Sequence, residues 1–151
     1  TVARRVISED PDTFRLTTTA DWLIDPLQEY TDTIALQWSD NFTMGEDLGY
    51  IVNEDGDRDY YDAVRNDVVP EKGVAWDLDL NLNQDETGAV LEAIVTKPDS
   101  SGTANVVGEY GHVQVRPSDV RVGFSSSGVD MTVGLAATVN QASPDYDYFE
   151  Y

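Results

Sequence analysis

The stretch from Trp76 to Leu82 constrains the fold more than any other part of this sequence. It reads Trp-Asp-Leu-Asp-Leu-Asn-Leu, so large apolar residues alternate with short polar ones. A period of two places the apolar side chains on one face of a β-strand and the polar ones on the other. In a helix the three polar side chains would be scattered around the axis. We therefore expect a strand with one buried and one wet face at the centre of a two-layer β core.

Further runs of the same kind lie on both sides of this stretch. They occupy residues 14–24, 33–38, 48–52, 89–96 and 129–139. Turn signals rich in Gly, Pro, Ser and Asp separate them, for example Lys97–Gly102 and Ser125–Gly128. Eight or nine strands at this spacing predict an all-β chain, folded as an antiparallel β-sandwich or small β-barrel.

One segment breaks the strand pattern. Tyr61, Val64 and Val68 fall at helical spacing, and Pro70 follows them. Because a proline commonly stops a helix, we expect one short helix over Asp59–Val69.

The length of 151 residues fits one domain with a continuous core. We expect an N-terminal arm at residues 1–12, a β-sandwich domain at 13–139 and an acidic, tyrosine-rich tail at 140–151. The tail interleaves aromatic residues with acids, and aromatic rings are stable in an ordered segment only when they are buried. The rings can be buried against the chain's own domain or against a neighbouring subunit. We favour the neighbour and predict a subunit contact through four tail residues, namely Tyr146, Tyr148, Phe149 and Tyr151.

The charge is the most unusual property of the composition. The chain has 29 Asp and Glu against 9 Lys and Arg, for a net charge of −20, and only two of the basic residues are Lys. Such self-repulsion costs stability in dilute buffer, but the Debye length falls to about 3 Å in molar salt. The composition is therefore typical of a protein from an extremely salty environment, and an ordinary acidic secreted or Ca²⁺-loaded domain is the alternative.

The composition also excludes some classes of function. Direct nucleic-acid binding needs clustered Lys and Arg, which this chain lacks. No apolar run reaches the roughly 20 residues of a membrane span, and the N-terminus has no apolar signal core, although a removed signal would leave no trace. The absence of Cys excludes disulfides and thiolate metal sites.

The most distinctive group of polar residues is the sequence Asp55-Gly56-Asp57-Arg58-Asp59. Alternate carboxylates in a glycine-containing loop bring together the oxygen ligands that Ca²⁺ or Mg²⁺ requires. The pattern departs from an EF-hand loop, because Tyr60 stands where that loop needs its Gly. The alternative is a solvated acidic turn. The candidate metal ligands are Asn53, Asp55, Asp57, Asp59 and Asp62.

Three further features carry weaker signals. Asn41-Phe42-Thr43 fits the acceptor pattern for N-glycosylation at Asn41. His112 is the only histidine, and without a second His or a serine elbow it is interpreted as structural. The tryptophans lie in strand patterns that favour burial over an exposed sugar-stacking surface.

No motif names a reaction, and we expect no enzyme. The favoured hypothesis is a non-enzymatic structural subunit of an ordered assembly from a halophilic source, in particular a virion component such as a tail-tube, neck or capsid-decoration protein. Its partners would be copies of itself or other assembly subunits. The alternative is a secreted or cell-surface binding module that recognises carbohydrate or protein, and a Ca²⁺ ion in the Asp55–Asp59 loop would make this recognition Ca²⁺-dependent. An exposed Trp or Tyr surface beside the Asp55–Asp59 loop would favour this alternative.

Overall fold

The structure is a computed structural model. It describes residues 2–8, 11–22, 31–39, 42–80, 85–98, 102–113, 120–126, 128–133, 139–141 and 145–150. These residues form thirteen strands and no helix. The strands are β1 (Val2–Ser8), β2 (Thr13–Asp21), β3 (Thr31–Trp38), β4 (Thr43–Asn53), β5 (Arg58–Asp59), β6 (Ala63–Val69), β7 (Gly73–Asp79), β8 (Glu86–Thr96), β9 (Thr103–Val113), β10 (Val120–Ser125), β11 (Gly128–Val133), β12 (Val139–Gln141) and β13 (Asp145–Glu150).

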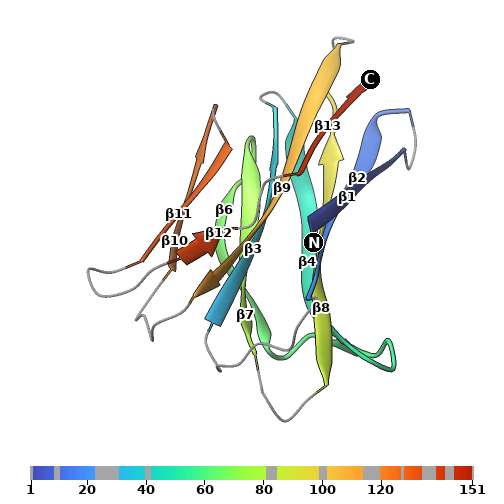
Figure 1. Cartoon of the computed structure of the whole chain (residues 1–151). Coiled ribbons are helices and arrows are strands. Elements are labelled where there is room, and N and C mark those ends of the chain that lie inside the picture. Colours follow the sequence, from blue (N-terminus) through green and yellow to red (C-terminus); the bar gives the residue numbers. More distant parts are fainter. Residues whose placement is uncertain are drawn as a thin grey trace.

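The strands build two antiparallel sheets and a separate hairpin (Figure 1). The first sheet has the order β1-β2-β8-β4-β5. The second has the order β12-β9-β3-β7-β6, and β13 also pairs with β9. Strands β10 and β11 form the hairpin. The expected all-β sandwich is thereby confirmed, and the strand of the Trp76 stretch, β7, lies beside the middle strand β3.

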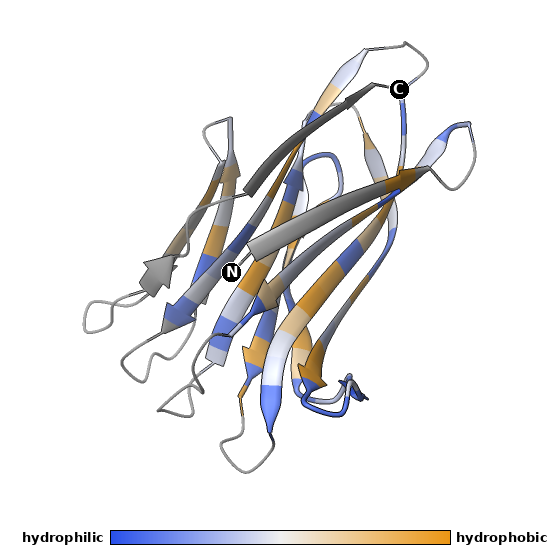
Figure 2. Cartoon of the chain, turned by 45° about the vertical axis from the view of Figure 1, so that its right-hand side comes forward, coloured by the Kyte–Doolittle hydropathy of each residue, from blue (hydrophilic) through white to orange (hydrophobic). Residues whose placement is uncertain are grey.

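One continuous core fills the space between the two sheets. Alternate residues along each strand supply it, as a period of two requires. Leu16 and Leu91 of the first sheet and Ile34, Leu36 and Leu78 of the second have no exposed surface. Figure 2 shows where the hydrophobic residues, in orange, occur along the strands. The alternation that the sequence predicts for β7 is present, because Leu78 and Leu80 are buried while Asp79 is exposed.

A second, smaller core lies on the outer face of the second sheet. The β10–β11 hairpin covers Ala35 and Ala75 with Val122, Val129 and Met131. Small residues at the sheet positions allow this close approach. At Gly73 a Cβ atom would lie 2.5 Å from the ring of Phe124, so this glycine is required by the packing of the hairpin.

The predicted helix at Asp59–Val69 is wrong. Residues 63–69 form β6, which pairs antiparallel with β7. A register shift between Arg65 and Asp67 marks a β-bulge, and a bulge adds one residue to a strand and interrupts its period of two. Tyr61 precedes this strand, and both Tyr61 and Val64 are mostly exposed, so the helical spacing of Tyr61, Val64 and Val68 does not mark a buried face.

Both ends of the chain are paired as strands. The N-terminal strand β1 pairs with β2 from Val2↔Ala20 to Ser8↔Phe14. The C-terminal strand β13 pairs with β9 from Asp145↔Gly108 to Glu150↔Thr103. Strand β1 also lies against β9 and β13, so the two ends meet at one side of the sandwich (Figure 1).

Candidate functional site

The predicted cation-binding loop connects β4 to β5 and folds through its own hydrogen bonds. The Asp57 amide donates to Asn53 Oδ1 at 2.8 Å, and the Gly56 amide donates to the Asn53 carbonyl at 3.0 Å. Gly56 has a φ of +81°, a conformation that a glycine adopts without strain. Just beyond the loop, the Tyr61 amide donates to Asp59 Oδ1 at 2.7 Å. Asn53 and Asp59, two of the five predicted ligands, thus already accept hydrogen bonds from nearby backbone amides.

The carboxylates of this loop do not converge. Within the described part of the chain, no group of three or more His, Asp or Glu side chains is arranged to hold a metal ion. Asp62 follows the loop, and its pKa is raised by burial and by the negative charges of Asp59 and Asp79. The Ca²⁺ or Mg²⁺ site therefore stays a prediction.

Two tyrosines beside this loop form an exposed aromatic surface. The side chain of Tyr61 is 93% exposed and that of Tyr60 is 44% exposed. Tyr60 lies against Tyr50, with ring centroids 5.4 Å apart, and the guanidinium carbon of Arg58 lies 4.8 Å from the Tyr50 ring centre. A cavity of about 270 Å³ adjoins this surface. It is lined by Ile51, Asn53, Asp57, Arg58, Asp59, Tyr61 and Glu86.

The single histidine belongs to a buried hydrogen-bond network between β3 and β9. Asp32 is fully buried, and its two carboxylate oxygens lie 2.9 and 3.0 Å from His112 Nδ1. The Tyr110 hydroxyl donates to the same carboxylate and accepts from Trp22 Nε1 at 2.8 Å. Burial raises the pKa of Tyr110, and the negative charge of Asp32 raises it further. The network therefore connects Trp22 and Asp32 to Tyr110 and His112, which are far away in the sequence.

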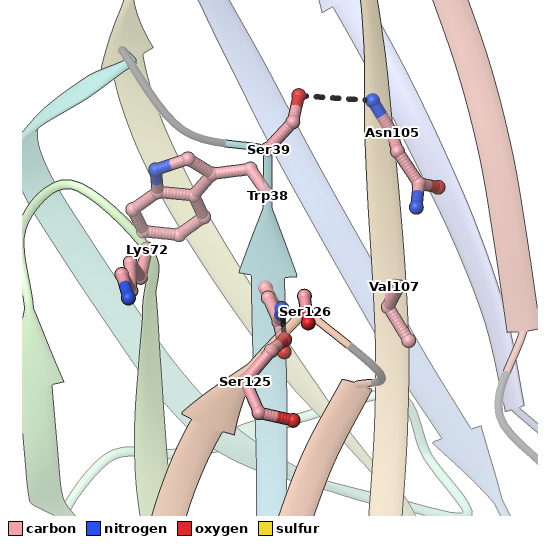
Figure 3. Close-up of a pocket in the computed structure, with 8 residues that line it drawn as sticks. Trp38, Ser39, Lys72, Asn105, Val107, Ser125 and Ser126 are labelled. Atoms are coloured by element: carbon pink, nitrogen blue, oxygen red, sulfur yellow. Dashed lines mark hydrogen bonds between the residues drawn. The ribbon is translucent and has the colours of Figure 1, made fainter.

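A second cavity, of about 230 Å³, lies where β3 and β9 meet the tip of the β10–β11 hairpin (Figure 3). It is lined by Gln37, Trp38, Ser39, Lys72, Asn105, Val107, Ser125 and Ser126. The backbone amide of Asn105 donates to Ser39 Oγ at 3.1 Å. The side-chain amide nitrogen of Gln37, Nε2, donates to the Ser125 carbonyl at 2.5 Å. Three polar atoms are buried and have no hydrogen-bond partner among the described residues, namely Gln37 Oε1, Trp38 Nε1 and Asn105 Oδ1.

The remaining predicted residues are placed only in part. Tyr146, Tyr148 and Phe149 belong to β13, where Tyr146 pairs with Val107 and Tyr148 with Asn105 of β9. The tail backbone therefore runs beside two residues of the second cavity. Tyr151 and the glycosylation candidate Asn41 lie outside the described residues. The subunit contact and the glycosylation stay predictions.

Sequence reasoning missed the second cavity. Gln37 is the polar residue of a strand whose opposite face is Ile34, Leu36 and Trp38, so the period of two placed it on a wet face. Its sequence signal was therefore that of an ordinary surface residue. Only the hairpin, which comes from residues about 90 positions later, turns this face into a cavity.

Comparisons with known proteins give a fold and no family. No family model matches the sequence, and no curated protein matches it. Among solved structures, the collagen-binding subdomain of the Enterococcus faecalis surface protein ACE is similar, with a TM-score of 0.51 and 10% identity, over 93% of this chain and 92% of that chain. At this identity the similarity shows the fold alone, and this fold is a β-sandwich.

Two other solved structures are more distant. A collagen-binding domain from a Staphylococcus aureus adhesin has a TM-score of 0.42 and 8% identity, over 87% of this chain and 93% of that chain. The pilus backbone protein of Streptococcus pneumoniae has a TM-score of 0.39 and 8% identity, over 92% of this chain and 43% of that chain. Neither similarity is strong enough to carry an argument. No helix in the described residues is long and apolar enough to cross a membrane.

Proposed function

We propose that this chain is a non-enzymatic extracellular binding module that recognises carbohydrate or protein in concentrated salt. The observation that carries the proposal is the exposure of Tyr61 and Tyr60 beside the cavity of the β4–β5 loop. Tyrosine offers a large, rigid contact surface with a polar tip, and exposed aromatic residues are enriched where proteins bind partners. The sandwich fold that the chain shares with the ACE subdomain is compatible with this role.

The charge of the molecule supports the salt-rich setting. The acidic residues with exposed side chains include Glu46, Glu54, Asp55, Asp57, Glu71, Asp79 and Asp85. With 29 acids and 9 Lys and Arg, most carboxylates have no basic side chain to pair with. In molar salt the Debye length is about 3 Å, so the repulsion between these carboxylates is screened while the carboxylates keep the surface hydrated.

Binding assays in molar KCl test the proposal. The probes are a glycan array and immobilised collagen, since collagen binding is named for the ACE subdomain. We expect binding to at least one probe, and we expect the double variant Tyr60→Ala/Tyr61→Ala to lose it. Thr96→Ala, an exposed position at the end of β8, is the matched control. Binding that the double variant retains, or no binding to either probe, contradicts the proposal.

A second candidate function is a structural subunit of an ordered assembly, such as a virion tail-tube, neck or capsid-decoration protein. The observation that bears on it is the pairing of both terminal strands with the chain's own sheets, β1 on β2 and β13 on β9, because it shows two strand edges that accept these segments. A terminal strand that leaves its own sheet can take the same place on a neighbouring copy, which links subunits through backbone hydrogen bonds. The tyrosine-rich tail would then form the predicted subunit contact.

Light scattering coupled to size-exclusion chromatography tests this second candidate. The full chain in molar KCl is expected to elute as an oligomer, and a variant that ends at residue 144 is expected to elute as a monomer. A full chain that stays monomeric at high protein concentration contradicts the assembly role. This result leaves the binding proposal untouched, because Tyr60 and Tyr61 do not lie on the terminal strands.

A further inference from the structure

Three unpartnered polar atoms belong to residues that line the same cavity. Two are amide oxygens, Gln37 Oε1 and Asn105 Oδ1, and the third is the indole nitrogen Trp38 Nε1. A buried polar group without a partner destabilises the folded state, and nearly all such groups in proteins are paired. Trp38 belongs to the main core on the opposite face of β3, but Gln37 and Asn105 share the face that carries Val107. Two unpartnered amide oxygens on one face indicate that something missing from the protein alone completes this site.

We propose that this cavity binds one polyhydroxyl molecule of about the size of a single sugar ring. The site shares no lining residue with the cavity beside Tyr60 and Tyr61, so the inference does not depend on the proposed function. Its volume of about 230 Å³ lies below the range of roughly 300–1,000 Å³ that drug-sized ligands occupy.

The chemistry of the lining selects the class of ligand. The two amide oxygens accept hydrogen bonds, so the ligand must donate. The Lys72 ammonium donates, and the hydroxyls of Ser39 and Ser126 can donate as well, so the ligand must also accept. The Ser125 hydroxyl already donates to the Gly128 carbonyl and can only accept. A hydroxyl group does both at one atom. A polyol ring therefore matches this mixture better than a carboxylate, which only accepts, or an ammonium, which only donates.

The charge of the residues that line the cavity also favours an uncharged polyhydroxyl ligand. None of the eight described residues that line the cavity is acidic, in a chain with 29 Asp and Glu. Lys72 is the one charged residue among the eight, and its side chain is exposed. A metal ion or an organic cation would find no carboxylate there. Val107 adds an apolar wall for the carbon face of a ring.

The oxygens must turn to reach a ligand. Gln37 Oε1 and Asn105 Oδ1 are buried, and the Gln37 amide is held by the Ser125 carbonyl of the hairpin tip. The terminal torsions of Gln and Asn side chains have broad, shallow preferences, so a modest rotation can present an amide oxygen to the cavity. Figure 3 shows the residues that take part, with Ser125 and Ser126 near the end of β3 and Asn105 and Val107 on β9.

Saturation-transfer NMR and calorimetry on the full chain in molar KCl test the inference. The probes are glucose, galactose, mannose and N-acetylglucosamine at millimolar concentration, with acetate as the carboxylate arm. We expect transfer to at least one sugar and none to acetate. Asn105→Leu and Gln37→Met each remove one amide oxygen, so each is expected to weaken sugar binding about tenfold. Thr96→Ala, at an exposed position at the end of β8 and outside this cavity, is expected to bind the sugar as the parent does.

A crystal structure of the unaltered chain soaked with the same sugars makes the test independent of the variants. Sugar density within hydrogen-bond distance of Asn105 or Gln37 supports the inference, even if a variant fails to fold. Water molecules alone on Gln37 Oε1 and Asn105 Oδ1, with no saturation transfer, overturn it. Binding of acetate alone, or sugar binding that both variants retain, overturns it as well.

Discussion

Trp76 Nε1 on β7 donates a hydrogen bond to Asp47 Oδ2 on β4, over 2.7 Å, and so joins the two sheets. Arg65 on β6 binds the same carboxylate, with its Nε 2.8 Å from Oδ2. The Asp47 side chain is only 1% exposed, while that of Arg65 is 50% exposed. A buried carboxylate is stable only when it is paired and hydrogen-bonded, and both partners of this one come from the opposite sheet. The Trp76 ring also packs directly on Gly49 of β4.

We predict that Gly49→Ala destabilises the protein. A Cβ atom at this position would lie 2.6 Å from Trp76 Cδ2, so the indole would have to shift away from Asp47. Overpacking of this kind typically costs about 1–3 kcal/mol in the free energy of unfolding. Chemical denaturation of both proteins in the same salt measures the difference.

Gly45→Ala is the control for this prediction, since it lies on the same strand. The nearest atom to a Cβ there, the Ile94 carbonyl oxygen, is 3.9 Å away, which is an ordinary contact. Its effect should stay within about 0.5 kcal/mol. Equal effects at positions 45 and 49 would show that the Trp76 contact does not matter.

We predict that stability falls in alkali because of Tyr110. Burial and the Asp32 charge raise the pKa of this hydroxyl above its ordinary value of 10. A raised pKa in the folded state gives stability that is complete below about pH 10 and is lost as pH rises above it. Tyr110→Phe should reduce this alkaline slope, and the remainder comes from Tyr50, whose pKa is also raised by burial. At neutral pH the substitution should cost about 1–3 kcal/mol because Asp32 loses a donor. Unfolding curves of both proteins across the alkaline range measure this difference. Equal slopes for Tyr110→Phe and the parent would contradict the hydrogen bond between Tyr110 and Asp32.

Asp62→Asn is predicted to stabilise the protein slightly at neutral pH in dilute buffer. The pKa of Asp62 is raised by burial and by its neighbours Asp59 and Asp79, so its ionised form is unfavourable in the folded state. The gain should be at most about 0.5 kcal/mol, because the residue is largely solvated. It should vanish below the pKa of Asp62, where both side chains are neutral, and it should shrink in molar KCl. A gain that is independent of salt would mean that charge is not its cause.

The melting temperature is predicted to rise steeply from dilute buffer to molar KCl or NaCl. The reason is the net charge of −20, whose repulsion is screened as the Debye length shrinks. Thermal melts at increasing KCl, with a neutral osmolyte as the control for changes in solvent activity, measure this dependence. A melting temperature that does not respond to salt argues strongly against a halophilic source.

Removal of metal is predicted to leave the melting temperature unchanged. The β4–β5 loop is closed by hydrogen bonds of its own, including the one from the Asp57 amide to Asn53 Oδ1. Calorimetric titration of chelator-treated protein with Ca²⁺ and Mg²⁺ then decides whether the loop binds a cation. A lack of heat at millimolar Ca²⁺ would end the metal prediction that Asn53, Asp55, Asp57, Asp59 and Asp62 suggest.

The all-β class of this chain could be predicted from local residue patterns. The wrong helix at Asp59–Val69 shows that such patterns do not predict features that depend on pairing with another strand. The alternation around Leu78 and Leu80 is local, and burial of one face follows from it directly. The bulge in β6 is not local, because its register is set by pairing with β7. The exposure of Tyr60 and Tyr61 depends on the same pairing, because strands rather than a helix flank them.

The sequence by itself determined the all-β class, the faces of the long strands and the net charge of −20, because side-chain period and charge are properties of the chain alone. The tertiary structure decided which distant residues meet. Asp32 finds His112 and Tyr110, Asp47 finds Trp76, and Gln37 comes to lie under Ser125. Strand order and the position of the β10–β11 hairpin create these contacts, and neither is encoded in the spacing of any single segment.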